Sequence, residues 1–149
     1  MKKTMMTLGI AVCAAMLFSF SKIGGDSYTI HLNEKQLVQH YVHSKAATPS
    51  LTLAQATAND QLSVYYNECG EIGKERKLSI RDEKDNTLKE WQFANVTGAH
   101  APMICKTKEI LALKKNGVSK FKLYYGSRRV SGGQLLAIID VADNLKARK

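Results

Sequence analysis

The chain has 149 residues and a formal net charge of +9. This length holds one ordinary domain after removal of a leader, and such a domain buries enough apolar surface to fold without a metal. The basic residues are scattered rather than interleaved with aromatic residues in one tract, so we expect no nucleic-acid partner. No cofactor is expected either.

Residues 1–21 have the pattern of a secretory signal peptide. Two lysines precede an apolar run from Met5 to Phe20, which is shorter than the ~20 residues of a comfortable membrane span. Small residues favour cleavage after Ser21. A retained membrane anchor and a lipidated Cys13 are the alternatives. We expect an exported protein, periplasmic or secreted, with no stable membrane span after cleavage.

The mature domain is expected to comprise residues 22–149. Its net charge is +7, because the leader holds two lysines and no acidic residue.

The first elements of this domain are predicted to form a hairpin. Residues alternate between apolar and polar from Ser27 to Leu32, which predicts a strand. Gln36 to Val42 predicts its partner, although this mixed pattern also suits a short helix. A brief strand is expected at Leu51–Leu53.

The stretch from Gln61 to Phe93 predicts three consecutive strands. Leu62, Val64 and Tyr66 alternate with polar neighbours, and the same period recurs through residues 77–81 and around Trp91. Between the last two runs, Asp82–Asn86 has the composition of a tight turn. So short a turn requires antiparallel strands.

The C-terminal third predicts one short helix and two strands. Thr107 is a candidate cap for a connecting helix near residues 107–116, which Gly117 would end. Strands are expected over Lys120–Tyr125 and Leu135–Val141. Many short, mostly antiparallel strands indicate a mostly β protein, an antiparallel β-sandwich of jelly-roll-like form. The alternative is an open α+β sheet.

Two cysteines follow the leader, at Cys69 and Cys105. In an exported protein such a pair favours a disulfide bond. Closing this loop would stabilise the fold by roughly 4 kcal/mol on a chain-entropy estimate. Two unpaired thiols are the alternative.

No arrangement of residues predicts a metal site. His40 and His43 lie three residues apart and would point to opposite faces of a strand. His100, Met103 and Cys105 are soft ligands, but a copper site of this kind needs a second imidazole.

Catalytic motifs are likewise absent from the sequence. It has no nucleophile elbow, no phosphate-binding glycine loop and no zinc-protease motif. Glu68, Glu71 and Asp82 could supply a carboxylate pair, but acidic residues near loops are usually only solvated. We therefore expect a protein that is not an enzyme and has no catalytic residues.

A binding surface is favoured over a catalytic site, and an ordinary sandwich surface is the alternative interpretation of the same residues. Tyrosines on outward strand faces, together with basic neighbours, suit a sugar ring or an acidic polymer. The candidate binding residues are Tyr65, Lys120, Lys122, Tyr124, Arg128 and Arg129. We expect an exported, non-enzymatic module that binds a protein or glycan partner. The alternatives are an envelope-associated hydrolase and a protein that binds anionic surfaces.

Overall fold

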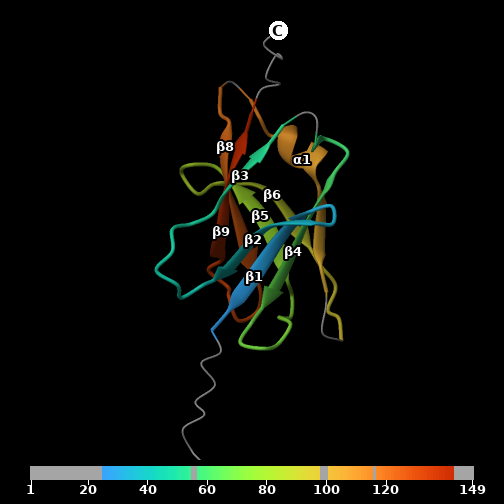
Figure 1. The fold of residues 1–149 in the computed structure, drawn as a ribbon, viewed down its shortest axis with the longest axis vertical. Coiled ribbons are helices and arrows are strands. Elements are labelled where there is room, and N and C mark those ends of the chain that lie inside the picture. The colour runs from blue at the N-terminus through green and yellow to red at the C-terminus, as the bar shows by residue number, and fades with distance from the viewer. Residues whose placement is uncertain (1–24, 55–56, 98–100, 116, 143–149) are drawn as a thin grey trace, which may run out of the picture.

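The computed structural model describes residues 25–54, 57–97, 101–115 and 117–142. In these ranges the chain forms nine strands and one short helix, arranged as two sheets packed face to face (Figure 1). The predicted β-sandwich is therefore confirmed. The expected leader lies outside the described residues. In the part of the chain that is described, no helix is long and apolar enough to cross a bilayer.

Sheet A is antiparallel and has the strand order β2-β1-β4-β7. Its strands are β1 (Ser27–Leu32), β2 (Lys35–Tyr41), β4 (Gln61–Asn67) and β7 (Met103–Lys106). The hairpin of β1 and β2 is confirmed, and it turns at Asn33, whose φ of 53° lies in the left-handed region that asparagine tolerates. Strand β7 was not predicted from the sequence. It pairs with only the first half of β4.

Sheet B has the strand order β3-β9-β8-β5-β6. Its strands are β3 (Ser50–Leu53), β5 (Lys77–Arg81), β6 (Thr87–Gln92), β8 (Lys120–Gly126) and β9 (Gln134–Val141). The predicted turn between β5 and β6 is confirmed: Asp82 Oδ1 accepts hydrogen bonds from the backbone N–H groups of Lys84 and Asn86, each at 2.9 Å. Strands β3 and β9 run parallel, whereas the other described pairs are antiparallel.

The core lies between the inner faces of the two sheets. As the alternation predicts, β4 and β8 turn these side chains inward: Leu62, Val64, Tyr66, Phe121, Leu123 and Tyr125. Ring stacking and hydrogen bonding both cross the sandwich. The rings of Tyr66 and Tyr125 stack with centroids 3.9 Å apart, and the Tyr28 hydroxyl donates to the carbonyl of Leu136 at 2.6 Å.

The predicted helix is shorter than expected. Helix α1 covers Thr107–Leu111, and its N-cap is Lys106, whose side chain makes no capping hydrogen bond. The Thr107 hydroxyl instead donates to the carbonyls of Thr57 and, at 3.1 Å, Asp60. The proposed capping role of Thr107 is therefore wrong, because its side chain fastens the helix to the loop before β4.

The predicted disulfide is also wrong, since both Cys69 and Cys105 are free thiols. Cys105 pairs with Leu62 at the start of β4, whereas Cys69 follows the end of that strand. Strand β4 alone separates them by roughly 16 Å, at ~3.3 Å per residue, and a disulfide needs Cα atoms within about 7 Å. Burial raises the pKa of the Cys105 thiol to about 12, which keeps this thiol protonated and unreactive.

Candidate functional site

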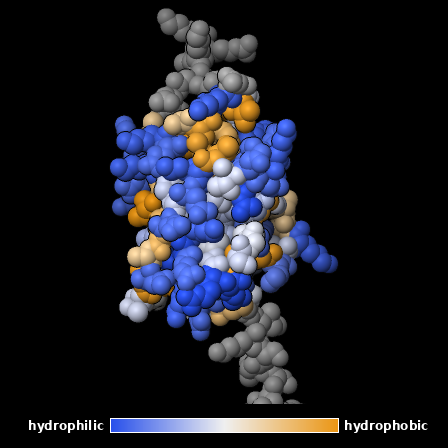
Figure 2. Space-filling view, turned by 180° about the vertical axis from the view of Figure 1, so that it is seen from behind, coloured by the Kyte–Doolittle hydropathy of each residue, from blue (hydrophilic) through white to orange (hydrophobic). Residues whose placement is uncertain are grey.

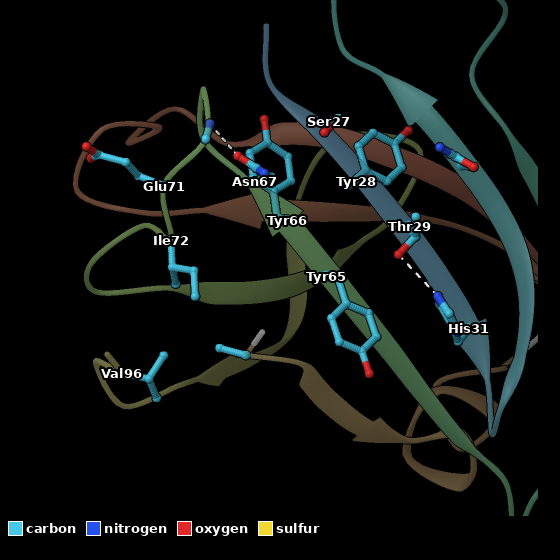
Figure 3. A pocket seen from close by; sticks show the side chains of 13 residues that line it. Ser27, Tyr28, Thr29, His31, Tyr65, Tyr66, Asn67, Glu71, Ile72 and Val96 are labelled. Atoms are coloured by element: carbon cyan, nitrogen blue, oxygen red, sulfur yellow. Dashed lines mark hydrogen bonds between the residues drawn. The ribbon is translucent and has the colours of Figure 1, made fainter. Parts of the chain in front are cut away.

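A groove of about 910 Å³ lies on the outer face of sheet A, the face directed away from sheet B (Figure 3). This volume is in the range of ordinary small-ligand sites, roughly 300–1,000 Å³. Strands β1 and β4 form its floor. Gln39 of β2 lines one side, and the segment from Gly70 to Ile72 lines the other.

The floor of the groove follows from the alternation of its strands. Thr29 and His31 alternate with core residues of β1, and Tyr65 does the same on β4, so all three side chains point outward. The antiparallel register sets Thr29 directly opposite Tyr65. The rings of His31 and Tyr65 lie 5.1 Å apart, and the His31 Nε2 and Thr29 Oγ1 atoms are 3.2 Å apart. Aromatic and hydroxyl groups thus share one surface.

A tight turn shapes one end of the groove. After β4 the chain reverses through Cys69 and Gly70, whose φ values of 52° and 96° are left-handed. The Asn67 Oδ1 atom accepts a hydrogen bond from the Gly70 N–H at 2.5 Å. This reversal brings Glu71 and Ile72 back to the groove (Figure 3).

Val96 and Ala101 add an apolar part to the wall. Arg76, a buried residue, binds the backbone at Ala94 and at Ala101. Its guanidinium donates to the carbonyls of Ala101 at 2.7 Å and Ala94 at 3.2 Å. Arg76 directly precedes β5, so this part of the wall is attached to sheet B.

Glu71 is the one carboxylate among the described residues that line the groove, and these residues include no lysine or arginine. The remaining polar groups are hydroxyls, amides and an imidazole, from Ser27, Thr29, Asn67, Gln39 and His31. Such groups donate and accept hydrogen bonds without favouring a charged ligand. Together with the Tyr65 ring, they suit a ligand rich in hydroxyl groups.

A second polar feature lies at the end of the sandwich, and we term it the carboxylate cluster. Its members are Asp26, Tyr66, Glu68, Cys69, Tyr125, Ser127 and Arg129. Arg129 joins two buried carboxylates: its Nη2 atom lies 2.5 Å from Asp26 Oδ1 and its Nε atom 2.9 Å from Glu68 Oε2. Asp26 precedes β1 in sheet A, and Arg129 follows β8 in sheet B, so the cluster links the sheets.

Each carboxylate of the cluster receives further hydrogen bonds. Asp26 accepts from the Tyr66 hydroxyl at 2.9 Å and from the Cys69 thiol at 3.2 Å. Burial raises the pKa of Asp26. The hydrogen bonds from Arg129, Cys69 and Tyr66 lower this pKa by a larger amount, so the net shift is downward. Asp26 is therefore ionised at neutral pH.

Glu68 is held in the same way from sheet B. Its Oε1 atom accepts from the Tyr125 hydroxyl at 2.7 Å and from the Ser127 hydroxyl at 2.5 Å. Burial raises the pKa of Glu68, yet the bonds from Ser127, Tyr125 and Arg129 outweigh this effect, and the net pKa falls below its ordinary value. Both carboxylates thus have partners that favour the charged form.

These shifts predict how stability changes with pH. The folded pKa values of Asp26 and Glu68 lie below their ordinary values of 3.8 and 4.5, so the unfolded chain binds more protons in acid. Their stabilisation should be complete above about pH 5.5 and should decrease as the pH falls through the ordinary values toward the lower folded ones. Urea unfolding between about pH 3 and 7 measures this change.

The double variant Asp26→Asn, Glu68→Gln isolates this effect from that of the other acidic residues. It should be less stable at neutral pH and should lose less free energy of unfolding than the unmodified protein as the pH falls. Equal losses for the two proteins would contradict the assignment of the shift to this pair.

The structure places the six predicted binding residues at separate sites. Tyr65 lies in the groove on sheet A. Lys120, Lys122 and Tyr124 belong to β8 and alternate with its core residues, so they lie on the outer face of sheet B. Figure 2 views the molecule from behind Figure 1, and hydrophilic residues predominate on that side. The six residues therefore do not form one surface.

Several of these predicted residues already have partners within the chain. Lys122 Nζ and the Tyr124 hydroxyl both contact Asp85 Oδ1, at 2.9 and 3.1 Å. Arg128 pairs with Glu75 at 2.5 Å on the surface. Arg129 belongs to the carboxylate cluster. Basic residues that are paired in this way are less available to an acidic ligand.

The histidine and cysteine patterns do not converge in the described ranges. His40 packs against the Tyr28 ring, with centroids 5.4 Å apart, and His43 is exposed in the following turn. Met103 and Cys105 are buried in the core, and His100 lies outside the described residues. In those ranges, no three His, Cys, Asp or Glu residues are grouped to hold a metal ion.

Sequence reasoning found Tyr65 but missed most of the groove. The polar outward face of β1 carries Ser27, Thr29 and His31, and its alternation was the available signal. That signal identifies an outward face without saying that a turn encloses it.

Comparisons with known protein families, with curated proteins and with solved structures each found no match. The function is therefore inferred from the geometry of this groove.

Proposed function

We propose that this protein is an exported, non-enzymatic binding module that holds a glycan in the groove on sheet A. The observation that carries this proposal is the partly exposed Tyr65 ring beside His31, with hydroxyl and amide side chains around it. An aromatic ring packs against the apolar face of a sugar, and neighbouring polar groups bind its hydroxyls.

The charges of the groove favour a neutral glycan over an acidic polymer. Glu71 at the rim repels anions, and no lysine or arginine is among the described residues that line the groove. The basic residues of β8 lie on the opposite side of the sandwich, where Asp85 pairs with Lys122. Electrostatic attraction of an acidic chain would act at a different surface from the aromatic platform.

The bonding of the carboxylates supports binding rather than hydrolysis. An enzyme that cleaves glycosidic bonds commonly uses two carboxyl groups that flank the bond to be broken. Asp26 and Glu68 are the buried carboxylates of this end of the molecule, and Arg129 joins them while hydroxyl groups occupy their remaining oxygens. Their role in this proposal is to fix the turn after β4 that borders the groove.

An array of neutral oligosaccharides, followed by calorimetric titration of the strongest binder, tests the proposal. Tyr65→Ala should weaken binding by about tenfold, because the variant loses the stacking platform. The fold should persist, since Tyr65 lies outside the core. Circular dichroism and a thermal melt verify this.

Tyr124→Ala is the matched control, because it removes a partly exposed tyrosine from the outer face of the other sheet. This variant should bind as the unmodified protein does. Loss of binding in Tyr124→Ala with full binding in Tyr65→Ala would place the ligand on sheet B and contradict the proposal. Failure of every neutral oligosaccharide to bind would contradict it as well.

A further inference from the structure

Strand β2 forms one edge of sheet A, and half of its backbone groups point away from the sheet. The Val42 N–H donates to the Asp26 carbonyl at 2.9 Å, which continues the ladder in which His40 pairs with Tyr28. Alternation then directs the backbone groups of Gln39 and the N–H of Tyr41 outward. Within the described ranges, none of these groups has a hydrogen-bond partner. A strand could therefore pair with this edge.

The other edges of the two sheets carry features that oppose such pairing. Strand β3 has only four residues and follows Pro49, β7 has four and follows Pro102, and β6 carries Lys89 at its centre. Short length, proline and charge are the usual protections of an edge strand. The stretch from Gln36 to His43 contains no proline, lysine, arginine or acidic residue. From Val38 to Tyr41 the β2 edge thus lacks the prolines and charges of the other edges, although the strand begins with Lys35 and has a bulge at Leu37.

Large apolar side chains also lie along β2. Leu37 is 37% exposed and Tyr41 is 61% exposed, and both belong to this strand. A bulge interrupts the pairing of β1 with β2 next to Leu37, so the regular edge runs from Val38 to Tyr41. The edge therefore offers both backbone groups and apolar contact area.

We propose that β2 pairs with β2 of a second copy of this chain, antiparallel about a twofold axis through Gln39. In this register Gln39 lies opposite Gln39 of the second copy, and the bulged Leu37 lies at the end of the regular stretch, next to Tyr41 of the second copy. The arrangement is self-complementary, as a twofold interface requires. Cross-strand contact of an aliphatic and an aromatic residue also stabilises antiparallel pairs.

Charge explains why a second copy can bind at this edge. Two chains that each carry a net charge of +7 after loss of the leader repel each other, so their contact is least unfavourable where charged residues are absent. The β2 edge meets this condition from Gln36 to His43. The pairing would join the two A sheets into one continuous sheet and place both grooves on the same side of it.

Sedimentation velocity of the exported protein, at about 1 to 100 μM, tests this inference. The unmodified protein should sediment increasingly as a dimer. Leu37→Lys places a charge at the edge and should raise the dissociation constant of the dimer about tenfold or more. Leu88→Lys is the matched control, because Leu88 is 41% exposed on the β6 edge and receives the same charge.

Gln39→Pro provides a second, backbone test. Proline removes the outward N–H of residue 39 and leaves the hydrogen bonds between β1 and β2 in place, as edge strands allow. This variant should remain folded by circular dichroism and should sediment as a monomer. A monomeric unmodified protein at all these concentrations would overturn the inference. So would a dimer that Leu88→Lys disrupts and that Leu37→Lys and Gln39→Pro leave intact.

Discussion

Replacing Arg129 with alanine is expected to lower the free energy of unfolding by about 3 kcal/mol, measured by urea denaturation at neutral pH. The reason is the burial of its two partners. Asp26 and Glu68 are 7% and 8% exposed, and the guanidinium is their one cationic contact among the described residues. Without it, two negative charges remain buried close to each other. The half-exposed Arg129 side chain lets water screen the pair, so we place the loss at the lower end for buried ion pairs.

The neighbouring arginine supplies the control. Arg128 pairs with Glu75, but both side chains of this pair are exposed. Solvent screens an exposed ion pair, so Arg128→Ala should leave the free energy of unfolding close to that of the unmodified protein. Equal losses in the two variants would show that the carboxylate cluster does not depend on Arg129.

The sequence predicted the sandwich because the signal for most strands, β7 excepted, is local. A period of two along β4 and β8 requires one buried face on each strand, and the turn at Asp82–Asn86 requires antiparallel neighbours. These features need no knowledge of distant residues. The inward faces of Tyr66 and Tyr125 could therefore be assigned correctly before their ring contact was known.

Contacts between distant segments could not be predicted in the same way. Export context favoured a bond between Cys69 and Cys105, but the register of β4 with β7 keeps them apart. The six predicted binding residues all lie on outward faces or loops, and alternation does not say which sheet an outward face belongs to. Consequently Tyr65 and Tyr124 were grouped although they lie on opposite sides of the sandwich.

The carboxylate cluster illustrates the same limit. Arg129 contacts Asp26 across 103 residues of sequence and Glu68 across 61. In the sequence each is an isolated charge near a loop, and such charges are usually solvated. Only the packing of β1, β4 and β8 brings them together.

Replacing Gly73 with alanine is expected to destabilise the protein by about 3 kcal/mol, as severe overpacking does. Gly73 is buried, and a Cβ atom there would overlap both the Glu68 carboxylate and the Tyr125 hydroxyl. Neither group can move freely, because they hydrogen-bond each other and Glu68 is also held by Ser127 and Arg129. A thermal melt and urea denaturation measure the loss.

Gly132→Ala makes the same change where no atom lies within 4 Å of the added Cβ. It should be neutral or stabilise slightly, because alanine restricts the unfolded chain. The double variant Gly73→Ala, Glu68→Ala tests the cause of the Gly73 effect. Shortening Glu68 removes one of the two overlaps, so the double variant should lose less than the sum of the single losses. Strict additivity would contradict a clash between residue 73 and the carboxylate, and would locate the cost of Gly73→Ala elsewhere in the turn.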